Sequence, residues 1–264
     1  MKDFKRHQRQ HLPTPTGPYK VVLHSPSIWR DFSECRLQIS VGRAKHEGDK
    51  FFALTEWAAA RFDKVTFVVS DTLQRHNLAL DMGIDLDEAY DVALIKGREW
   101  LRDNKRAIDN VPAHKKNIML WDDWLSHPDY AETRIEINTL YAYNPFFKLA
   151  VDAKANEFLD RRAAQGEDLS GRRSEIFKIS VRYILEEMAA FAIMLRQQPV
   201  LDIYPGPWFK EIFDLIAQTS TNPLLSGFEH AAFIHVGYRI NGAYLRQGNA
   251  EDFVNLPEES KAKA

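Results

Sequence analysis

The sequence predicts an α/β fold: a Rossmann-like, mainly parallel sheet with helices on both faces. Short apolar segments rich in β-branched residues alternate with longer segments of helical periodicity along most of the chain. The clearest strand is residues 64–70, Lys-Val-Thr-Phe-Val-Val-Ser, whose continuously apolar centre is typical of a strand covered on both sides. Repeated strand–helix units need crossover connections, and these favour parallel strands.

The other elements follow from alternation, periodicity and breakers. In chain order, strands are predicted at residues 36–40, 64–70, 117–120, 199–204 and 231–239. Helices are predicted at about residues 50–62, 85–107, 145–164, 172–197 and 208–218, with one more after Ser126. Asp85 and Glu88 have capping-box spacing, and we expect Ser126 with Asp129 to cap the helix that follows them.

Composition and length bound the class of protein. The chain has 264 residues, 45% hydrophobic and 27% charged, with a net charge of −2. We expect a flexible basic arm over residues 1–20, one Rossmann-like catalytic domain over 21–255 and a flexible tail over 256–264. Cys35 is the only cysteine, which excludes an internal disulfide framework and cysteine-based zinc sites. With no bilayer-length apolar run and no signal-peptide pattern, we predict a cytoplasmic protein that does not bind membranes.

Ser40 is the first candidate functional residue. It ends the strand at residues 36–40, and ligands of open α/β sheets bind at the carboxyl ends of strands. A serine there is also a common turn former or helix cap, and the G-x-S-x-G nucleophile elbow is absent. Its significance therefore depends on residues elsewhere in the chain.

Three further residues complete the candidate site. Tyr183 and Glu187 are four residues apart, which puts a phenol and a carboxylate on one helix face, where together they suit a protonated amine. Tyr204 ends the strand at residues 199–204 and is expected near Ser40. The structural alternatives are a surface carboxylate beside a half-buried tyrosine, and a tyrosine that only terminates a strand.

This ordered set resembles the tRNA-dependent cyclodipeptide synthases over roughly residues 37–239. In that family a serine lies in an I-S-x-G stretch, a Tyr-x-x-x-Glu pair follows on a later helix, and a tyrosine ends the next strand. The corresponding residues here are Ile39-Ser40-Val41-Gly42, Tyr183 with Glu187, and Tyr204. The resemblance implies a fold similar to the catalytic domain of class I tyrosyl- and tryptophanyl-tRNA synthetases.

The markers after Ser40 and Tyr204 resemble one of the two branches of the family. Arg43 stands where the other branch has asparagine, and Pro205 stands where it has histidine. Gln38 departs from the small residue of well-known members at a position that lines their first aminoacyl pocket. The resemblance thus implies that Gln38, Gly42, Arg43 and Pro205 contact substrate.

Family membership implies that two aminoacyl-tRNAs are converted into a cyclic dipeptide, a diketopiperazine. Ser40 would carry aminoacyl and then dipeptidyl esters, while Tyr183 and Glu187 anchor the amino group and Glu187 or Tyr204 assists proton transfer. The substrates arrive activated, and the sequence contains no P-loop, H-x-G-H or K-M-S-K-S motif. We therefore predict no ATP, no metal and no other cofactor, and the resemblance also implies a monomer.

A cationic stripe is the predicted contact for tRNA. Arg98, Arg102, Lys105 and Arg106 recur at helical spacing, and the corresponding helix of the family is basic and binds tRNA. Without the resemblance, the same pattern is a solvated helix face with internal ion pairs.

Two other functions remain open on sequence grounds. One is a serine esterase or acyltransferase, with His46 or His235 as the base for Ser40. The other is a non-catalytic RNA-binding module with a Rossmann-like fold, in which Ser40 is inert. Diketopiperazine release, ester cleavage or neither would separate the three.

Overall fold

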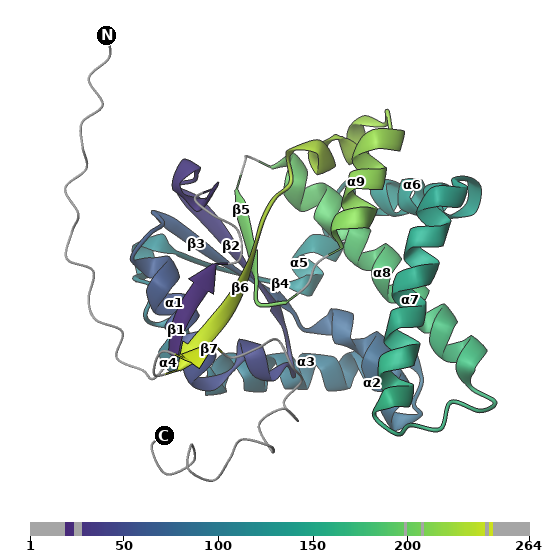
Figure 1. Ribbon diagram of the computed structural model, residues 1–264, viewed down its shortest axis with the longest axis horizontal. Helices are drawn as coiled ribbons and strands as arrows, with labels where there is room; N and C mark the ends of the chain where they lie inside the picture. The colour runs from purple at the N-terminus through teal and green to yellow at the C-terminus, as the bar shows by residue number, and fades with distance from the viewer. Residues whose placement is uncertain (1–18, 24–27, 198–199, 207–208, 241–242, 245–264) are drawn as a thin grey trace.

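The computed structural model describes residues 19–23, 28–197, 200–206, 209–240 and 243–244 (Figure 1). The strands are β1 (Tyr19–Leu23), β2 (Glu34–Ser40), β3 (Lys64–Ser70), β4 (Lys116–Leu120), β5 (Leu201–Tyr204), β6 (Ala232–Ile240) and β7 (Ala243–Tyr244). The α-helices are α1 (Gly48–Ala59), α2 (Arg75–Met82), α3 (Leu86–Asp103), α4 (Lys105–Ile108), α5 (Trp121–Leu125), α6 (Tyr130–Tyr143), α7 (Pro145–Ala164), α8 (Arg173–Arg196) and α9 (Lys210–Thr219). Short 3₁₀ helices are η1 (Ile28–Asp31), η2 (Ala44–His46), η3 (Thr72–Gln74), η4 (Ala113–Lys115) and η5 (Pro223–His230).

The sheet is mostly parallel and confirms the predicted fold class. Its described strands lie in the order β1-β6-β5-β2-β3-β4, with β7 paired to β6. Strands β2 to β6 run parallel, whereas β1 and β7 each pair antiparallel with β6. The chain builds outward from β2 through β3 to β4 and then returns to the other side of β2 as β5. The boundary between β2 and β5 is therefore the topological switch point, where ligands of open α/β sheets bind.

Helices cover both faces of the sheet (Figure 1). One core lies between the sheet and α1, α3 and α4, and includes Phe51, Phe67 and Trp100. The other joins α5 to α9 with η5, and includes Met188 and Phe213. Helix α8 is buried along most of its second half, as expected for the central helix of its layer.

Alternation along β2 and β5 gives these strands one apolar and one polar face. Cys35, Leu37 and Ile39 enter the core beneath α1, whereas Arg36 and Gln38 contact Met194 of α8. Ser40 continues the second face. The polar face of β2 and β5 thus lies against α8, with Arg36 and Gln38 near its C-terminal end.

The structure corrects several local predictions. The helix predicted over residues 85–107 is interrupted at Asn104, whose side chain donates to Trp100 O at 3.0 Å and accepts from Gly48 N at 3.2 Å. Ser126 does not cap the next helix, because it terminates α5, and Asp129 precedes α6 without a side-chain capping bond. By contrast, the Asp85 cap is confirmed by its bonds from Asp87 N and Glu88 N.

The ends of the chain differ in part from the expected domain division. Tyr19 and Lys20, which the sequence predicts as the end of the basic arm, begin β1 and pair with Ile240 and Arg239. The rest of that predicted arm, residues 1–18, and the predicted tail, residues 256–264, lie outside the described residues. Pro199, the predicted start of β5, and Trp208, the predicted start of α9, also lie outside them.

Candidate active site

Two hydroxyl groups meet at the switch point of the sheet. Ser40 ends β2, Tyr204 ends the neighbouring strand β5, and the Ser40 Oγ and Tyr204 hydroxyl oxygens lie 3.4 Å apart. Because both strands run parallel, their carboxyl ends meet at one edge of the sheet. The sequence prediction that these two residues lie together is met by this geometry.

The chain leaves Ser40 through a tight turn. The Arg43 backbone N donates to Ser40 O at 3.3 Å, and Gly42 occupies the left-handed region with φ 81°. Glycine adopts this conformation without a Cβ penalty, so the residue suits the third position of the turn. Arg43 is consequently held close to Ser40 while its side chain remains exposed.

His46 supports the backbone of the nucleophile candidate. Its Nδ1 accepts the Ser40 backbone N–H at 2.9 Å, and its ring packs edge-on against Tyr204 with 5.2 Å between ring centroids. Burial, together with Arg43 and Lys45 nearby, lowers the pKa of His46 to about 3. His46 is therefore neutral at physiological pH and bonds the main chain of Ser40 rather than its hydroxyl. That arrangement disfavours it as the base of an esterase.

Helix α8 brings the predicted phenol and carboxylate to the same place. Tyr183 accepts a hydrogen bond from Gln74 Nε2 at 3.5 Å. Burial, reinforced by Glu187 and Tyr204, holds the pKa of Tyr183 well above its ordinary value. Burial likewise raises the pKa of Tyr204, and Glu187 adds to the shift. These mutual effects show that the two phenols and the carboxyl group share one electrostatic environment.

Glu187 has the chemical features of a receiving group. Its Oε2 is buried and has no hydrogen-bond partner among the described residues. Burial, together with Glu186, raises the pKa of Glu187 to about 8. The group is thus mostly protonated at pH 7, and a bound cation would favour its ionised form.

Sequence reasoning missed the neighbouring carboxylate, Glu186. Although burial alone would raise its pKa, hydrogen bonds and charges from His76 and Arg75 lower the pKa of Glu186 to about 2. Arg75 Nη2 donates at 2.5 Å, His76 Nε2 lies at 3.1 Å and Trp121 Nε1 donates at 3.0 Å. This ionised carboxylate therefore joins α8 to α2 and α5. No local sequence pattern distinguishes Glu186 from Glu187. The difference comes from the hydrogen-bond donors around Glu186, which belong to other segments of the chain.

Gln38 lies in an internal network. Its side chain is 5% exposed, and its Nε2 donates to Asp202 Oδ1 at 2.6 Å. Arg36 bonds both oxygens of Asp202, at 2.9 and 2.7 Å, and donates to Met194 O. Substrate contact by Gln38 stays a prediction, and the structure assigns its amide nitrogen a clear role in joining β2 to β5.

The residues after Tyr204 shape its position. Pro205 and Gly206 are both buried. A Cβ built on Gly206 would lie 2.7 Å from Tyr204 Cε1, closer than carbon atoms pack. The tyrosine ring therefore rests against a surface that only glycine provides.

The predicted tRNA-binding stripe is exposed but divided. Arg98 and Arg102 belong to α3, whereas Lys105 and Arg106 belong to α4 beyond the break at Asn104. Arg102 pairs with Asp103 at 2.8 Å, Lys105 pairs with Asp109, and Arg106 lies 4.7 Å from the centroid of the Phe52 ring. Partial internal neutralisation is thus present, and contact with tRNA stays a prediction.

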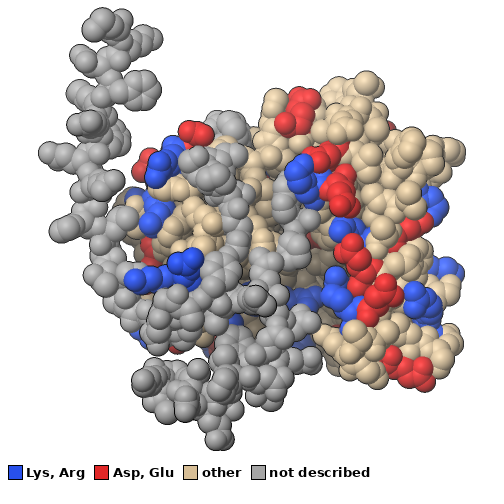
Figure 2. Space-filling view, in the orientation of Figure 1, with Lys and Arg blue, Asp and Glu red and all other residues tan. Residues whose placement is uncertain are grey.

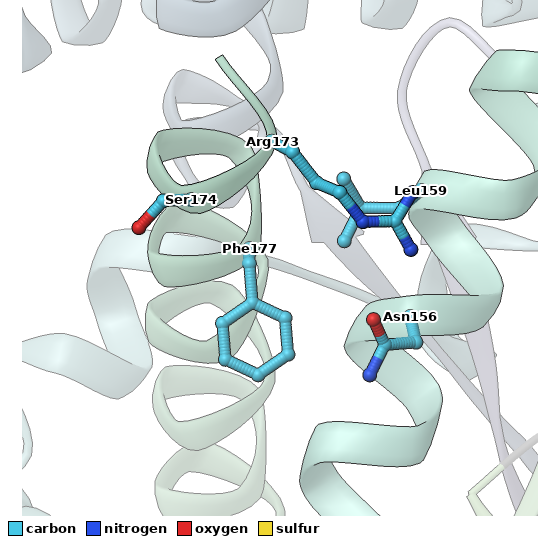
Figure 3. Close-up of a pocket in the computed structure, with 5 residues that line it drawn as sticks. All are labelled: Asn156, Leu159, Arg173, Ser174 and Phe177. Carbon is cyan, nitrogen blue, oxygen red and sulfur yellow. The ribbon is translucent and has the colours of Figure 1, made fainter. Parts of the chain in front are cut away.

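The remaining surface gives little further indication of a site. On the face in Figure 2, Lys and Arg alternate with Asp and Glu over the helical layer of α7 to α9. A hollow between α7 and α8 is lined by Asn156, Leu159, Arg173, Ser174 and Phe177, none of them predicted site residues (Figure 3). Among the described residues, no helix is long and apolar enough to cross a membrane. In the same residues, no group of three or more His, Cys, Asp or Glu is arranged to hold a metal ion.

Comparison with known proteins assigns the chain to a family. The sequence model described as cyclodipeptide synthase matches residues 21–196, well over half of the chain. The chain belongs to the cyclodipeptide synthase family. No curated protein sequence matches it significantly.

Solved cyclodipeptide synthase structures agree. A synthase from Fluoribacter dumoffii is 26% identical, with a TM-score of 0.73, over 84% of this chain and 98% of that one. A synthase from Candidatus Glomeribacter gigasporarum, bound to Phe-tRNAPhe, is 20% identical, with a TM-score of 0.62, over 82% and 93%. A Mycobacterium tuberculosis protein, reported as showing that cyclodipeptide synthetases are related to type I tRNA synthetases, is 16% identical, with a TM-score of 0.58, over 90% and 100%. These structures share the fold of this chain, and the predicted fold class is confirmed.

Proposed function

We propose that this protein joins the amino acids of two aminoacyl-tRNAs into a cyclic dipeptide, through aminoacyl and dipeptidyl esters of Ser40. The observation that carries the proposal is the cluster of Ser40, Tyr204, Tyr183 and Glu187 at the sheet switch point, with the Ser40 and Tyr204 oxygens 3.4 Å apart. Family membership supplies the reaction class, and the relative bound to Phe-tRNAPhe supports the substrate class.

In the first transfer, Ser40 Oγ attacks the ester carbonyl of one aminoacyl-tRNA. The bond between that carbonyl and the tRNA ribose oxygen breaks, and the tRNA leaves as an alcohol. The serine proton must therefore reach the departing oxygen. Tyr204 is suited to pass it, since its hydroxyl both donates and accepts and lies 3.4 Å from Ser40 Oγ.

The amino group of the seryl ester next needs to become a nucleophile. It arrives as an ammonium group, and free α-amino groups have a pKa of about 7.7–8.0. Glu187, with a pKa of about 8, is matched to exchange a proton with it, and its Oε2 has no hydrogen-bond partner in the described part of the chain. Tyr183, on the same helix face, holds the amine in place.

The second transfer and the ring closure then follow. The amine of the amino acid held on Ser40 attacks the ester carbonyl of the second aminoacyl-tRNA and displaces its tRNA. The dipeptide that forms remains esterified to Ser40. The amine of the second residue attacks the seryl ester, which closes the ring and returns Ser40 to its free form. Positioning within one pocket makes these steps effectively intramolecular, a large advantage over reaction in solution.

The proposal also includes the tRNA contact, the cofactor requirement, the domain and the family branch predicted from the sequence. The stripe of Arg98, Arg102, Lys105 and Arg106 receives tRNA, while substrates need neither ATP nor metal. Residues 21–255 act as one catalytic domain, as a monomer in the cytoplasm, and Arg43 and Pro205 favour the branch without asparagine and histidine.

Trapping the seryl ester tests the proposal. Purified protein is mixed with radiolabelled aminoacyl-tRNA, quenched in acid and analysed for covalent label. The wild type should be labelled, Ser40→Ala should not be, and Ser33→Ala should be labelled like the wild type. Diketopiperazines in the medium of an expressing bacterium should likewise depend on Ser40. Equal labelling of Ser40→Ala would refute the assignment.

A charge reversal tests the RNA contact. The double variant Arg102→Glu, Arg106→Glu should weaken aminoacyl-tRNA binding. The salt dependence of binding should also become shallower, because a protein that contacts fewer phosphates releases fewer counterions when it binds. The melting temperature should change little, since both side chains are exposed. Unchanged binding would mean that the stripe is only solvated surface.

A further inference from the structure

A buried polar cluster of Arg36, Gln38 and Asp202, the α8 clamp, joins the sheet to the C-terminal end of α8. Arg36 and Asp202 are cross-strand neighbours on β2 and β5, and their side chains form a two-pronged ion pair with bonds of 2.9 and 2.7 Å. Gln38 Nε2 donates to the same carboxylate at 2.6 Å. On the helix side, Arg36 Nη1 donates to Met194 O at 2.5 Å, and Gln38 Nε2 lies 3.8 Å from Met194 Sδ. Two residues of β2 therefore contact α8 at the same methionine.

The carbonyl group of Met194 needs a partner from outside its helix. α8 ends at Arg196, and the last four carbonyl groups of an α-helix have no intrahelical donor. A cation at this end also meets the negative end of the helix dipole. The Arg36 guanidinium thus caps α8 from the sheet. Hydrogen bonds fix distance and direction, whereas apolar packing is non-directional.

The clamped methionine lies on the same stripe of α8 as the proposed amine site. Tyr183, Glu187 and Met194 are spaced by four and then seven residues, which places them on one helix face. The contact between Gln38 and Met194 Sδ turns this face toward the sheet. Fixing Met194 against β2 therefore also fixes where the other two side chains meet the sheet.

Lengths along the helix and the strand agree with this arrangement. Glu187 comes seven residues before Met194, which is about 10 Å along the helix. Ser40 comes four residues after Arg36 and two after Gln38, which is about 13 and 7 Å along the strand. The α8 clamp thus holds Glu187 at about the level of Ser40.

Stability by itself is a weak reason to bury this ion pair. Arg36 is 4% exposed and Asp202 is 0% exposed, and apolar residues of similar volume often replace such a pair without loss of stability. Apolar residues would not supply the directional bond that sets the register of α8. The two strands do not need the ion pair for their own register, because their backbones already pair.

We propose that Arg36 and Asp202 are positioning residues, which fix the register of α8 so that its amine-binding groups meet the ester carried by Ser40. This inference rests on the proposed function and adds two residues that the sequence did not single out as part of the site. Their effect passes through α8 rather than through contact with substrate.

The α8 clamp should affect the two transfers differently. The first transfer uses the hydroxyl groups of Ser40 and Tyr204, whose strands are held together by backbone pairing. The second transfer also uses Glu187, which α8 carries. A shift of α8 therefore leaves the formation of the seryl ester intact and slows its consumption.

A two-stage labelling experiment tests the α8 clamp. Enzyme in excess over radiolabelled aminoacyl-tRNA is first labelled on Ser40, and excess unlabelled aminoacyl-tRNA then chases the label into diketopiperazine. The main variant is Arg36→Met with Asp202→Leu, which removes both charges together and leaves no buried ion unpaired. It should melt near the wild-type temperature and label at the wild-type rate. Its chase should be at least tenfold slower, since displacement of a reacting group by 1 Å costs about 100-fold.

A second variant and a control complete the design. Arg36→Lys decides the question if the double variant does not fold: lysine keeps a cation beside Asp202 but lacks the planar fork that reaches both this carboxylate and Met194 O. Its labelling should be normal and its chase slowed. The control, Arg196→Gln with Asp129→Asn, removes an ion pair of 3.1 Å that joins the same end of α8 to the residue before α6. Both stages of the control should run as in the wild type.

The outcomes separate the α8 clamp from the proposed function. No labelling of the wild type refutes the proposed function itself. Equal losses in both stages by a folded variant indicate a structural role only and overturn the clamp, and a wild-type chase rate overturns it as well. The same selective slowing in the control would also overturn it, because any loosening of α8 would then suffice.

Discussion

Replacing Gly206 with alanine tests whether the position of Tyr204 matters independently of its chemistry. The new Cβ would lie 2.7 Å from Tyr204 Cε1, whereas carbon atoms pack at about 3.5–4.0 Å. The ring must therefore retreat by about 1 Å. Its hydroxyl is already 3.4 Å from Ser40 Oγ, so this retreat breaks the contact. Gly206 is not among the described glycines with positive φ, and alanine should not strain its backbone.

Misplacement of a reacting group by 1 Å costs about 10²-fold in rate, equivalent to about 2.7 kcal/mol. We therefore expect Gly206→Ala to label Ser40 about 100 times more slowly than wild type in a single-turnover assay. Its melting temperature should fall only slightly, because a side chain rather than backbone gives way. The control is Gly166→Ala, an exposed glycine with φ 87° and open space around it, which should lose some stability but no activity.

A double-mutant cycle makes the test specific. If Gly206 acts through the Tyr204 hydroxyl, Gly206→Ala should add little to the defect of Tyr204→Phe. Wild-type labelling by Gly206→Ala would refute the reasoning, and so would fully additive losses in the cycle.

Three further predictions concern stability. Asp202→Ala should lower the free energy of unfolding by about 3–5 kcal/mol in denaturant titrations, because Arg36 then remains charged, 4% exposed and unpaired; retained stability would mean that water reaches Arg36. Asn104→Ala should cost about 1–3 kcal/mol, because the Gly48 N–H loses its acceptor, and an unchanged melting curve would argue against that bond. Glu187 holds its proton up to a pH of about 8 in the folded state but ionises near its ordinary value of 4.5 when unfolded, so stability should fall as the pH rises between these values. Glu187→Gln should flatten that fall, and an identical pH dependence in the two proteins would contradict the raised pKa.

Much of the sheet was predictable from local patterns. The β-branched centre of β3 and the alternation in β2 locate these strands. A strand covered by helices needs apolar side chains on each face that packs against them. Strand β1 was missed, because five residues near a basic terminus become a strand only through pairing with β6, more than 200 residues away. The break at Asn104 was missed for a similar reason, since its acceptor role depends on Gly48 in another element.

The candidate site was predictable only in part. Helical spacing put Tyr183 and Glu187 on one face, and strand ends put Ser40 and Tyr204 at one edge of the sheet. Spacing could not show which of the adjacent residues Glu186 and Glu187 is ionised, because the donors Arg75, His76 and Trp121 come from distant segments.

The sequence by itself determined the alternation of strands and helices, the hydroxyl at a strand end and the order of the family motifs, because each depends on residues near one another in the chain. Only the tertiary structure decided which groups are desolvated and which carboxylate is kept ionised by hydrogen bonds from arginine and histidine. Burial and charge depend on neighbours in space, and those neighbours come from segments that only folding brings together.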